Sequence, residues 1–365
     1  MPGTVLIRRV EPDLWSIAPP GAPTVLDPAP ALDTTVLEVV GGHLSWSLLS
    51  GQRLPAAILH DPTSAQDWLW AIYGESVAVA LNDHTEPVEL SADPHLPETA
   101  TAARRLAYAH WAARWWPAST LDGIPALDQR LLDEEIATLT EECDLLVDGD
   151  DARPPVRELA AVPASARAED YALAAGESAG DQRGALTFAR GSGGWDWRRC
   201  PPGLVDASEQ AVSWELTRTG GLTAVRVRAV AAPGITAAIP GYLRPHAAID
   251  TGEGTVDIAL ELFGDTWQGL AEIGAQAVAR VEVYVPGVGP VTADPVEPAT
   301  RGRIRALAAE RLRRAAEPTT GDSADSRETA VTSGSADTSG AADSDDAEDA
   351  PLLAEIAAAA EDSDF

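Results

Sequence analysis

Apolar residues in the middle of the N-terminal half recur every three or four positions, which is the period of an α-helix. Tyr108, Trp111 and Trp115 share one face of a helix that we predict over residues 98–116. Pro117 is expected to end this helix, because proline disfavours the helical conformation of the residue before it. The remaining surface carries arginines, namely Arg104, Arg105 and Arg114. Burial of the aromatic face in the core is the simpler interpretation, and a surface for a ligand or a protein partner is the alternative.

A second helix is predicted to begin near Pro125, with Asp122 as its N-cap. Its apolar positions step by four and three residues, as in a heptad seam, and they are Leu132, Ile136, Leu139, Cys143 and Leu146. The other face is acidic and is formed by Asp133, Glu134, Glu135, Glu141 and Glu142. This pattern predicts that the seam packs in the core while the acidic face meets solvent.

Period-two alternation and turn residues predict strands on both sides of this helical pair. Before it we expect, in order, a strand at 5–10, a hairpin at 36–48 around Gly41-Gly42, a short strand at 58–59, a helix at 65–73 and a strand at 76–81. The segment 82–97 is polar, contains three prolines and is predicted to be a loop. After the pair we expect a hairpin at 212–229, strands at 256–262 and 281–285, and a basic helix at 301–316.

These elements predict an α+β fold with two domains, antiparallel β-hairpins and a helical pair between the β-rich regions. The expected parts are a mixed domain at 1–147, a partly helical linker at 148–185, a β-rich domain at 186–316, and a tail at 317–365. The β-rich domain is expected to be a sandwich or an open sheet that closes with a helix. The tail is acidic and poor in apolar residues, so it is predicted to be disordered.

One apolar segment interrupts the tail. Leu352, Leu353 and Ile356 are predicted to share one face of a short helix at 351–360, which begins at Pro351. A helix this short is marginal alone, so it is expected to become ordered only in the groove of a partner. A chance apolar cluster in an alanine-rich tail is the alternative.

Charge narrows the choice of partners. The chain of 365 residues has a formal net charge of −31, and all of its 26 basic residues are arginines, a usage typical of a high-GC bacterium. Such an acidic chain is not expected to bind nucleic acid or an anionic membrane directly, because both require clustered positive charge. A protein partner with a basic surface is more consistent with this negative net charge than either of these. The chain has no apolar run of roughly 18 residues and no signal-peptide segment at its N-terminus, so a cytoplasmic location is expected.

Catalytic signatures are weak. His84 and His95 bound an acidic loop that resembles a metal site only by composition, since their spacing matches no zinc signature. The glycines of residues 190–194 resemble a phosphate-binding loop, but the motif requires a lysine, and the chain has none. Cys143 and Cys200 form no CxxC pair. No cofactor is therefore predicted.

A short stretch in the second half is rich in interface-type residues. Trp195, Trp197 and Arg198 lie between glycines and prolines, and tryptophan and arginine dominate many protein interfaces. The alternative is that both tryptophans cover the core of the second domain from a loop.

These observations favour a non-enzymatic accessory or adaptor protein that acts through protein–protein contacts. The candidate contact residues are Tyr108, Trp111, Trp115, Trp195, Trp197, Arg198, Leu352, Leu353 and Ile356. The alternative is a metal-dependent enzyme whose site lies in the 84–95 loop, through His84 and His95, or between the two domains.

Overall fold

The computed structural model describes residues 3–28, 31–83, 86–147, 186–200, 203–235, 239–252, 254–274, 277–288, 298–317 and 350–362. Helices occur together with antiparallel sheets, which confirms the predicted α+β class. The chain forms two compact units and passes between them four times. Unit 1 contains Met1–Trp116, Leu127–Pro154 and Ala299–Phe365, and unit 2 contains Pro117–Ala126 and Pro155–Pro298. The basic helix predicted at 301–316 therefore groups with the N-terminal half, and not with the β-rich region that precedes it.

Unit 1 is built on a six-stranded antiparallel sheet with the order β3-β4-β5-β2-β1-β6. Its strands are β1 (Gly3–Glu11), β2 (Leu14–Ala18), β3 (Thr34–Val39), β4 (Gly42–Ser47), β5 (Ala56–Leu59) and β6 (Val88–Ala92). The predicted β3–β4 hairpin is confirmed. Gly41 turns it with a φ of 79°, and a Cβ at this position would lie 2.4 Å from the carbonyl oxygen of Asp61. Any other residue here would be strained and would also clash with backbone.

Two predictions for this region were wrong. Residues 76–81 belong to helix α2 (Glu75–Asp83) and not to a strand. The alternation of valine and alanine suggested a strand, but Val77, Ala80 and Leu81 are buried while Val79 is 48% exposed, which is a helical pattern. The predicted loop 82–97 contains strand β6, which pairs with β1 at the edge of the sheet. An edge strand is half exposed, so its apolar signal is weak.

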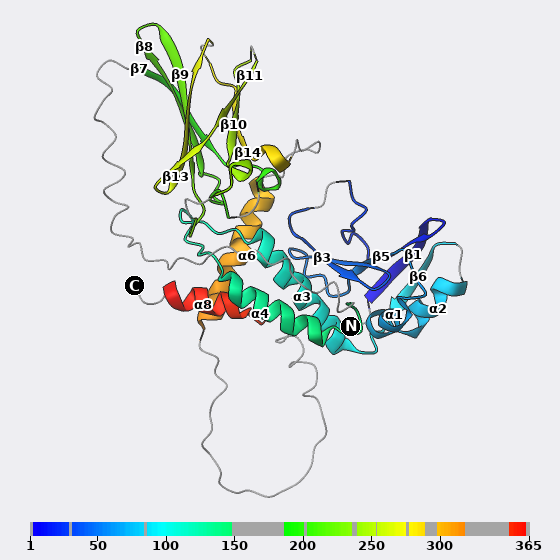
Figure 1. The fold of residues 1–365 in the computed structure, drawn as a ribbon. Coiled ribbons are helices and arrows are strands. Elements are labelled where there is room, and N and C mark those ends of the chain that lie inside the picture. Colours follow the sequence, from blue (N-terminus) through cyan, green and yellow to red (C-terminus); the bar gives the residue numbers. More distant parts are fainter. Residues whose placement is uncertain are drawn as a thin grey trace, which may run out of the picture. The chain divides into compact units, whose positions relative to one another are not determined.

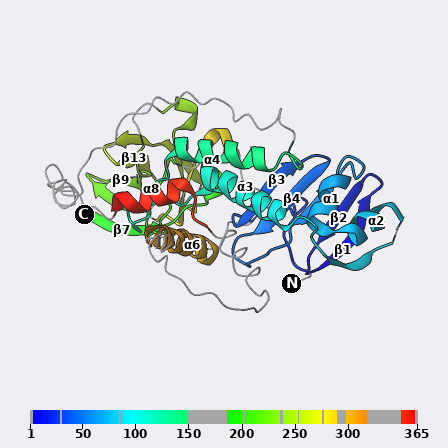
Figure 2. The same ribbon diagram turned by 90° about the horizontal axis from the view of Figure 1, so that it is seen from below.

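The helices of unit 1 are α1 (Gln66–Tyr73), α2, α3 (Pro97–Trp115), α4 (Gln129–Glu142), α6 (Pro298–Ala316) and α8 (Leu353–Asp362). Figures 1 and 2 both show α8 running beside α4. Helix α4 begins later than predicted, because Asp128 and not Asp122 is its N-cap and accepts hydrogen bonds from the backbone N–H groups of Arg130 and Leu131. The predicted seam is confirmed, since all five of its side chains are at most 5% exposed.

Leu139→Ala is expected to destabilise unit 1 by about 2–5 kcal/mol, because truncation of a buried leucine loses apolar contacts and leaves a cavity. Urea unfolding followed at amides of α3 and α4 measures this change. Leu26→Ala, at a leucine of unit 1 that is 42% exposed, is the matched control. A loss below about 0.5 kcal/mol, as at surface positions, would show that the seam is not core.

Unit 2 contains a five-stranded sheet with the order β12-β13-β9-β8-β7 and a three-stranded sheet with the order β11-β10-β14 (Figure 1). The larger sheet is formed by β7 (Leu186–Gly193), β8 (Val212–Thr219), β9 (Leu222–Val230), β12 (Glu261–Phe263) and β13 (Thr266–Ile273). The smaller sheet is formed by β10 (His246–Asp250), β11 (Thr255–Ala259) and β14 (Arg280–Tyr284). The hairpin predicted at 212–229 is confirmed as β8 and β9.

Two segments of unit 2 differ from the prediction. The strand expected at 256–262 is two strands, β11 and β12, which belong to different sheets. Between them Leu260 is fully buried. The glycine-rich segment 190–194 lies mostly in strand β7 and is not a phosphate loop. At Gly191 a Cβ would lie 2.7 Å from the indole of Trp214 on the neighbouring strand, so a glycine there lets that ring pack against the backbone.

Asp206 ties the segment between α3 and α4 into unit 2. Its side chain is fully buried and accepts hydrogen bonds from the hydroxyl of Ser119 (2.7 Å) and from the backbone N–H of Thr120 (2.7 Å). It also accepts from the N–H groups of Leu121 (3.4 Å) and Ser208 (2.9 Å). Four donors around one carboxylate compensate for its removal from water.

Candidate functional site

Helix α8 packs on α4 and forms hydrogen bonds with side chains of α3, α4 and α6. We call the surface of these three helices that α8 covers the groove. The predicted helix at 351–360 is confirmed, but the segment is ordered against its own chain, contrary to the expectation that only a partner would order it. The three residues predicted to share one apolar face differ in burial. Leu352 is fully buried, whereas Leu353 and Ile356 are 51% and 44% exposed. The buried face consists of Leu352, Ala354, Glu355, Ala358 and Ala359.

Glu355 is the centre of the contact. Its side chain is fully buried and accepts two hydrogen bonds from the guanidinium of Arg311, to Oε1 at 2.6 Å and to Oε2 at 2.8 Å. The hydroxyl of Tyr108 donates to Oε1 at 2.6 Å, and the Arg311 guanidinium lies 4.1 Å from the centre of the Tyr108 ring. A buried ion pair is favourable only when its other hydrogen-bonding groups are satisfied, and here the tyrosine and the backbone satisfy them.

A second buried glutamate lies on α4. Glu135, which was predicted to face solvent, is 6% exposed and accepts from Arg105 of α3 at 2.6 Å. Its other oxygen accepts from the backbone N–H of Leu353 at 2.7 Å. The N–H of Leu352 donates to Glu355 at 2.7 Å. At the start of α8, two N–H groups that have no helical carbonyl to donate to therefore donate to carboxylates. The negative charges of these carboxylates also interact favourably with the positive end of the helix dipole.

The two arginines bind the carbonyl groups just before the helix. Arg105 donates to the carbonyl oxygens of Ala350 (3.3 Å) and Pro351 (3.0 Å), and Arg311 donates to that of Ala350 (3.2 Å). Proline has no N–H group. The two arginines thus bind the carbonyl groups of residues 350 and 351, and the next two N–H groups donate to carboxylates. We call Arg105, Tyr108, Glu135 and Arg311 the α8 clamp.

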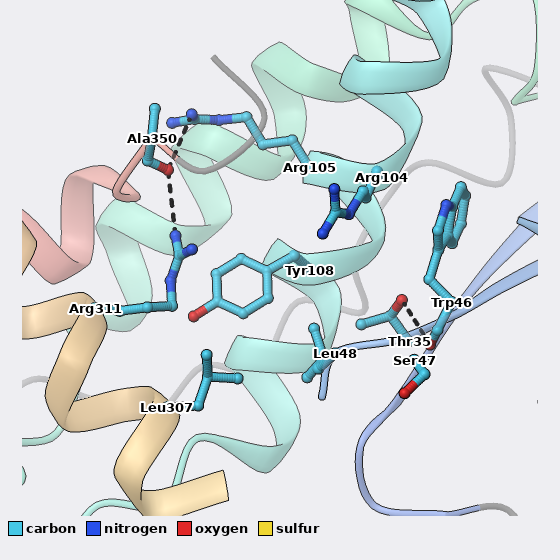
Figure 3. A pocket seen from close by; sticks show the side chains of 10 residues that line it. All are labelled: Thr35, Trp46, Ser47, Leu48, Arg104, Arg105, Tyr108, Leu307, Arg311 and Ala350. Carbon is cyan, nitrogen blue, oxygen red and sulfur yellow. Dashed lines mark hydrogen bonds between the residues drawn. The ribbon is translucent and has the colours of Figure 1, made fainter. Parts of the chain in front are cut away.

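A cavity of about 60 Å³ adjoins the α8 clamp (Figure 3). It is lined by β3 and β4 through residues such as Trp46, by α3 through Arg104, Arg105 and Tyr108, and by α6 through Arg311. One water molecule needs roughly 10–15 Å³ of cavity volume, so this cavity has room for several water molecules. It is too small for a drug-sized ligand, which occupies roughly 300 Å³ or more.

The aromatic face of α3 is mostly core, as the simpler interpretation held. Tyr108 and Trp111 are 7% and 4% exposed, and their rings stack with centroids 5.8 Å apart. The indole N–H of Trp111 donates to the carbonyl oxygen of Leu32 at 2.7 Å. Trp115 is half-buried. Of the three, only Tyr108 contacts the α8 segment through a described hydrogen bond, and it does so through its hydroxyl group.

Trp195 and Trp197 are placed in the core of unit 2, at 6% and 4% exposure. The indole N–H of Trp195 donates to the carbonyl oxygen of Asp206 at 2.7 Å. Arg198 is half-buried and bonds through two guanidinium nitrogens to the carboxylate of Asp196. These three residues therefore do not form an exposed aromatic surface, and the alternative interpretation, a cover over the core, describes them.

The suggested metal site gains no support from the described geometry. His84 lies outside the described residues, and the ring of His95 packs against Trp70 with centroids 3.8 Å apart. No group of three or more metal-binding side chains occurs among the residues that the structure describes. The cysteines are buried, and burial raises the pKa of Cys143 and of Cys200 to about 12, so both thiols stay protonated and unreactive.

Docking of α8 is expected to weaken as the pH rises above 10. Burial, followed by the charge of Glu355, raises the pKa of Tyr108 well above its usual 10. Release of α8 takes the charge of Glu355 away from the hydroxyl group and admits water, so the pKa of Tyr108 falls toward its usual range. The released state then binds fewer protons than the docked state, so docking is unaffected below pH 10 and loses free energy above it. A dye on the variant Glu361→Cys reports docking by fluorescence anisotropy, since the native thiols are buried.

Tyr108→Phe is the control for this titration, because phenylalanine cannot ionise. It is expected to weaken docking at neutral pH by one hydrogen bond and to flatten the alkaline transition. Tyr73 is also fully buried with a raised pKa and adds an alkaline loss of stability that both proteins share. An identical alkaline transition in both proteins would exclude Tyr108 as its cause.

The α8 clamp could not be predicted from the local sequence. Arg105 and Glu135 lie on faces that periodicity assigns to solvent, and Arg311 and Glu355 had no predicted role. One local signal was present, since Glu355 follows Leu352 by three residues, as in a capping box. Within the described part of the chain, every helix is too short or too polar to cross a membrane. Searches against family models, curated proteins and solved structures found no match.

Proposed function

We propose that the chain is an accessory or adaptor protein that acts by binding helical segments of proteins in the groove of α3, α4 and α6. The observation that carries this proposal is α8 itself. A helix that is distant in the sequence is held in the groove by a fully buried carboxylate and by three backbone groups, the carbonyls of Ala350 and Pro351 and the N–H of Leu353. This is the helix-in-groove mode of protein recognition, here with an occupant from the same chain.

The groove has the features of an interface and not of a catalytic centre. Its polar groups are paired with each other or with α8, and its arginines and glutamates bind backbone atoms. Paired charges of this kind favour one orientation of the occupant and penalise others, because an unpaired buried charge is costly. The net charge of −31 additionally favours a partner whose remaining surface is basic.

The proposal is tested with the full chain carrying Glu355→Arg, which places a second positive charge against Arg311 and should release α8. A labelled peptide of residues 350–362 is then added, and its binding is followed by fluorescence anisotropy. The variant is expected to bind the peptide with saturation, whereas the wild-type chain should bind it far more weakly because its groove is filled. Hydrogen exchange at α8 confirms that the segment has been released.

Leu352→Asp is a second way to release α8, since it buries a charge in place of the fully buried leucine. Glu361→Arg is the matched control, because Glu361 is exposed on the same helix. If both release variants fold, expose α8 and still fail to bind the peptide, the groove is not a binding surface and the proposal fails.

A further inference from the structure

We infer that the groove recognises the first turn of a partner helix with the pattern Pro-Leu-x-Ala-Glu, and that α8 is a built-in competitor for that partner. This inference rests on the proposed function and adds the chemistry of the partner. It follows from which atoms of α8 the chain contacts and which it leaves to solvent.

The backbone contacts require the start of a helix. The α8 clamp donates to two successive carbonyl groups and accepts, through Glu135, from the N–H of Leu353. Free N–H groups of this kind exist only in the first turn of a helix, because later ones bond to carbonyls of the preceding turn. Proline suits position 351, since this position lies before the helix and proline has no N–H group that needs an acceptor. The middle of a long helix therefore cannot bind in this way.

The side-chain contacts define two anchors. Leu352 is fully buried at the last position before the helix, and Glu355 is fully buried three residues later. Glu355 has a double role, because it accepts from Arg311 and Tyr108 and also caps the N–H of Leu352. A glutamine in its place would keep one oxygen but turn an N–H₂ group toward Arg311, which has only donors.

The other buried positions of α8 require small side chains, whereas its exposed positions can vary. Ala354 is fully buried and Ala358 and Ala359 are 5% exposed, so larger side chains there would hold the helix away from the groove. Leu353 and Ile356 are about half exposed and carry no described contact that fixes their identity. The partner motif is therefore Pro-Leu-x-Ala-Glu-x-x-Ala-Ala, in which the outward positions can vary.

Competition follows from covalent attachment. Residues 318–349 connect α6 to α8, so α8 competes at an effective concentration that for tethered ligands is on the order of millimolar. A free partner can bind only the small fraction of molecules whose groove is not occupied by α8, and its apparent affinity is reduced in proportion to that fraction. The intact chain therefore binds weakly, and any event that removes α8 from the groove switches binding on.

The test compares labelled 350–362 peptides on the full chain carrying Glu355→Arg. Glu355→Gln or Leu352→Ser within the peptide is expected to weaken binding at least about tenfold, since each removes a buried anchor. The double change Leu353→Ser and Ile356→Ser is the matched control and is expected to weaken binding less than either anchor change, because both side chains are about half exposed. The wild-type chain should bind the unmodified peptide at least about a hundredfold more weakly than the variant.

The possible failures are distinct. Absence of binding by every peptide would reject the proposed function. Binding that survives Glu355→Gln and Leu352→Ser but is lost when Leu353 and Ile356 change would overturn the inferred motif and leave the groove as an interface of another kind. Equal affinity of the wild-type chain and the variant would overturn the role of α8 as a competitor.

Discussion

Glu355→Ala is expected to release α8 from unit 1 while the six-stranded sheet and α1–α4 stay folded. The change leaves Arg311, the Tyr108 hydroxyl and the N–H of Leu352 without their carboxylate partner. Removing one member of a buried ion pair costs about 3–5 kcal/mol. A ten-residue helix cannot offset this cost, so it should leave the groove and allow water to reach Arg311.

Hydrogen exchange measures this release. Amides of 353–362 are expected to exchange as in a free peptide, whereas amides of β1, β4 and α3 keep their protection. Glu361→Ala is the control, because it removes an exposed carboxylate from the same helix and should change nothing. Wild-type protection of α8 in the Glu355→Ala chain would mean that apolar contacts alone hold the helix.

Asp206→Ala should destabilise unit 2 by about 3 kcal/mol or more. The alanine removes the acceptor for the Ser119 hydroxyl and for the N–H groups of Thr120, Leu121 and Ser208. A buried polar group left without a partner costs about 1–3 kcal/mol, and several are affected here. The segment 117–126 should lose protection first, because this carboxylate holds it.

Urea unfolding monitored at amides of β8 and β9 measures the loss. Asp206→Asn is expected to fall between wild type and alanine, since it keeps one acceptor oxygen but places an N–H₂ group near donors. Asp250→Ala, at an exposed aspartate of the same unit, should cost far less. If Asp206→Ala lowers the free energy of unfolding by less than about 0.5 kcal/mol, the hydrogen bonds of Asp206 do not stabilise unit 2.

The sequence by itself determined the elements with a strong local period. The seam from Leu132 to Leu146, the hairpin around Gly41 and the β8–β9 hairpin follow from spacing and from one residue with positive φ, which are properties of the local chain. It also determined that residues 351–360 favour a helix. Residues 318–349 and 148–185, predicted to be a disordered tail and a linker, lie outside the described residues.

Only the tertiary structure decided which face of α8 is buried and which charges lie inside. Periodicity assigns apolar residues to contact faces and charges to solvent, so it grouped Ile356 with Leu352 on one contact face and placed Glu135 in solvent. In the structure Ile356 is 44% exposed, Leu352 is fully buried and Glu135 is 6% exposed. A buried carboxylate is stable only with partners, and these partners come from α3, α4, α6 and α8, up to 247 residues apart in the chain. These pairs cannot be predicted from a local pattern, because they stabilise the protein only after the four helices have packed together.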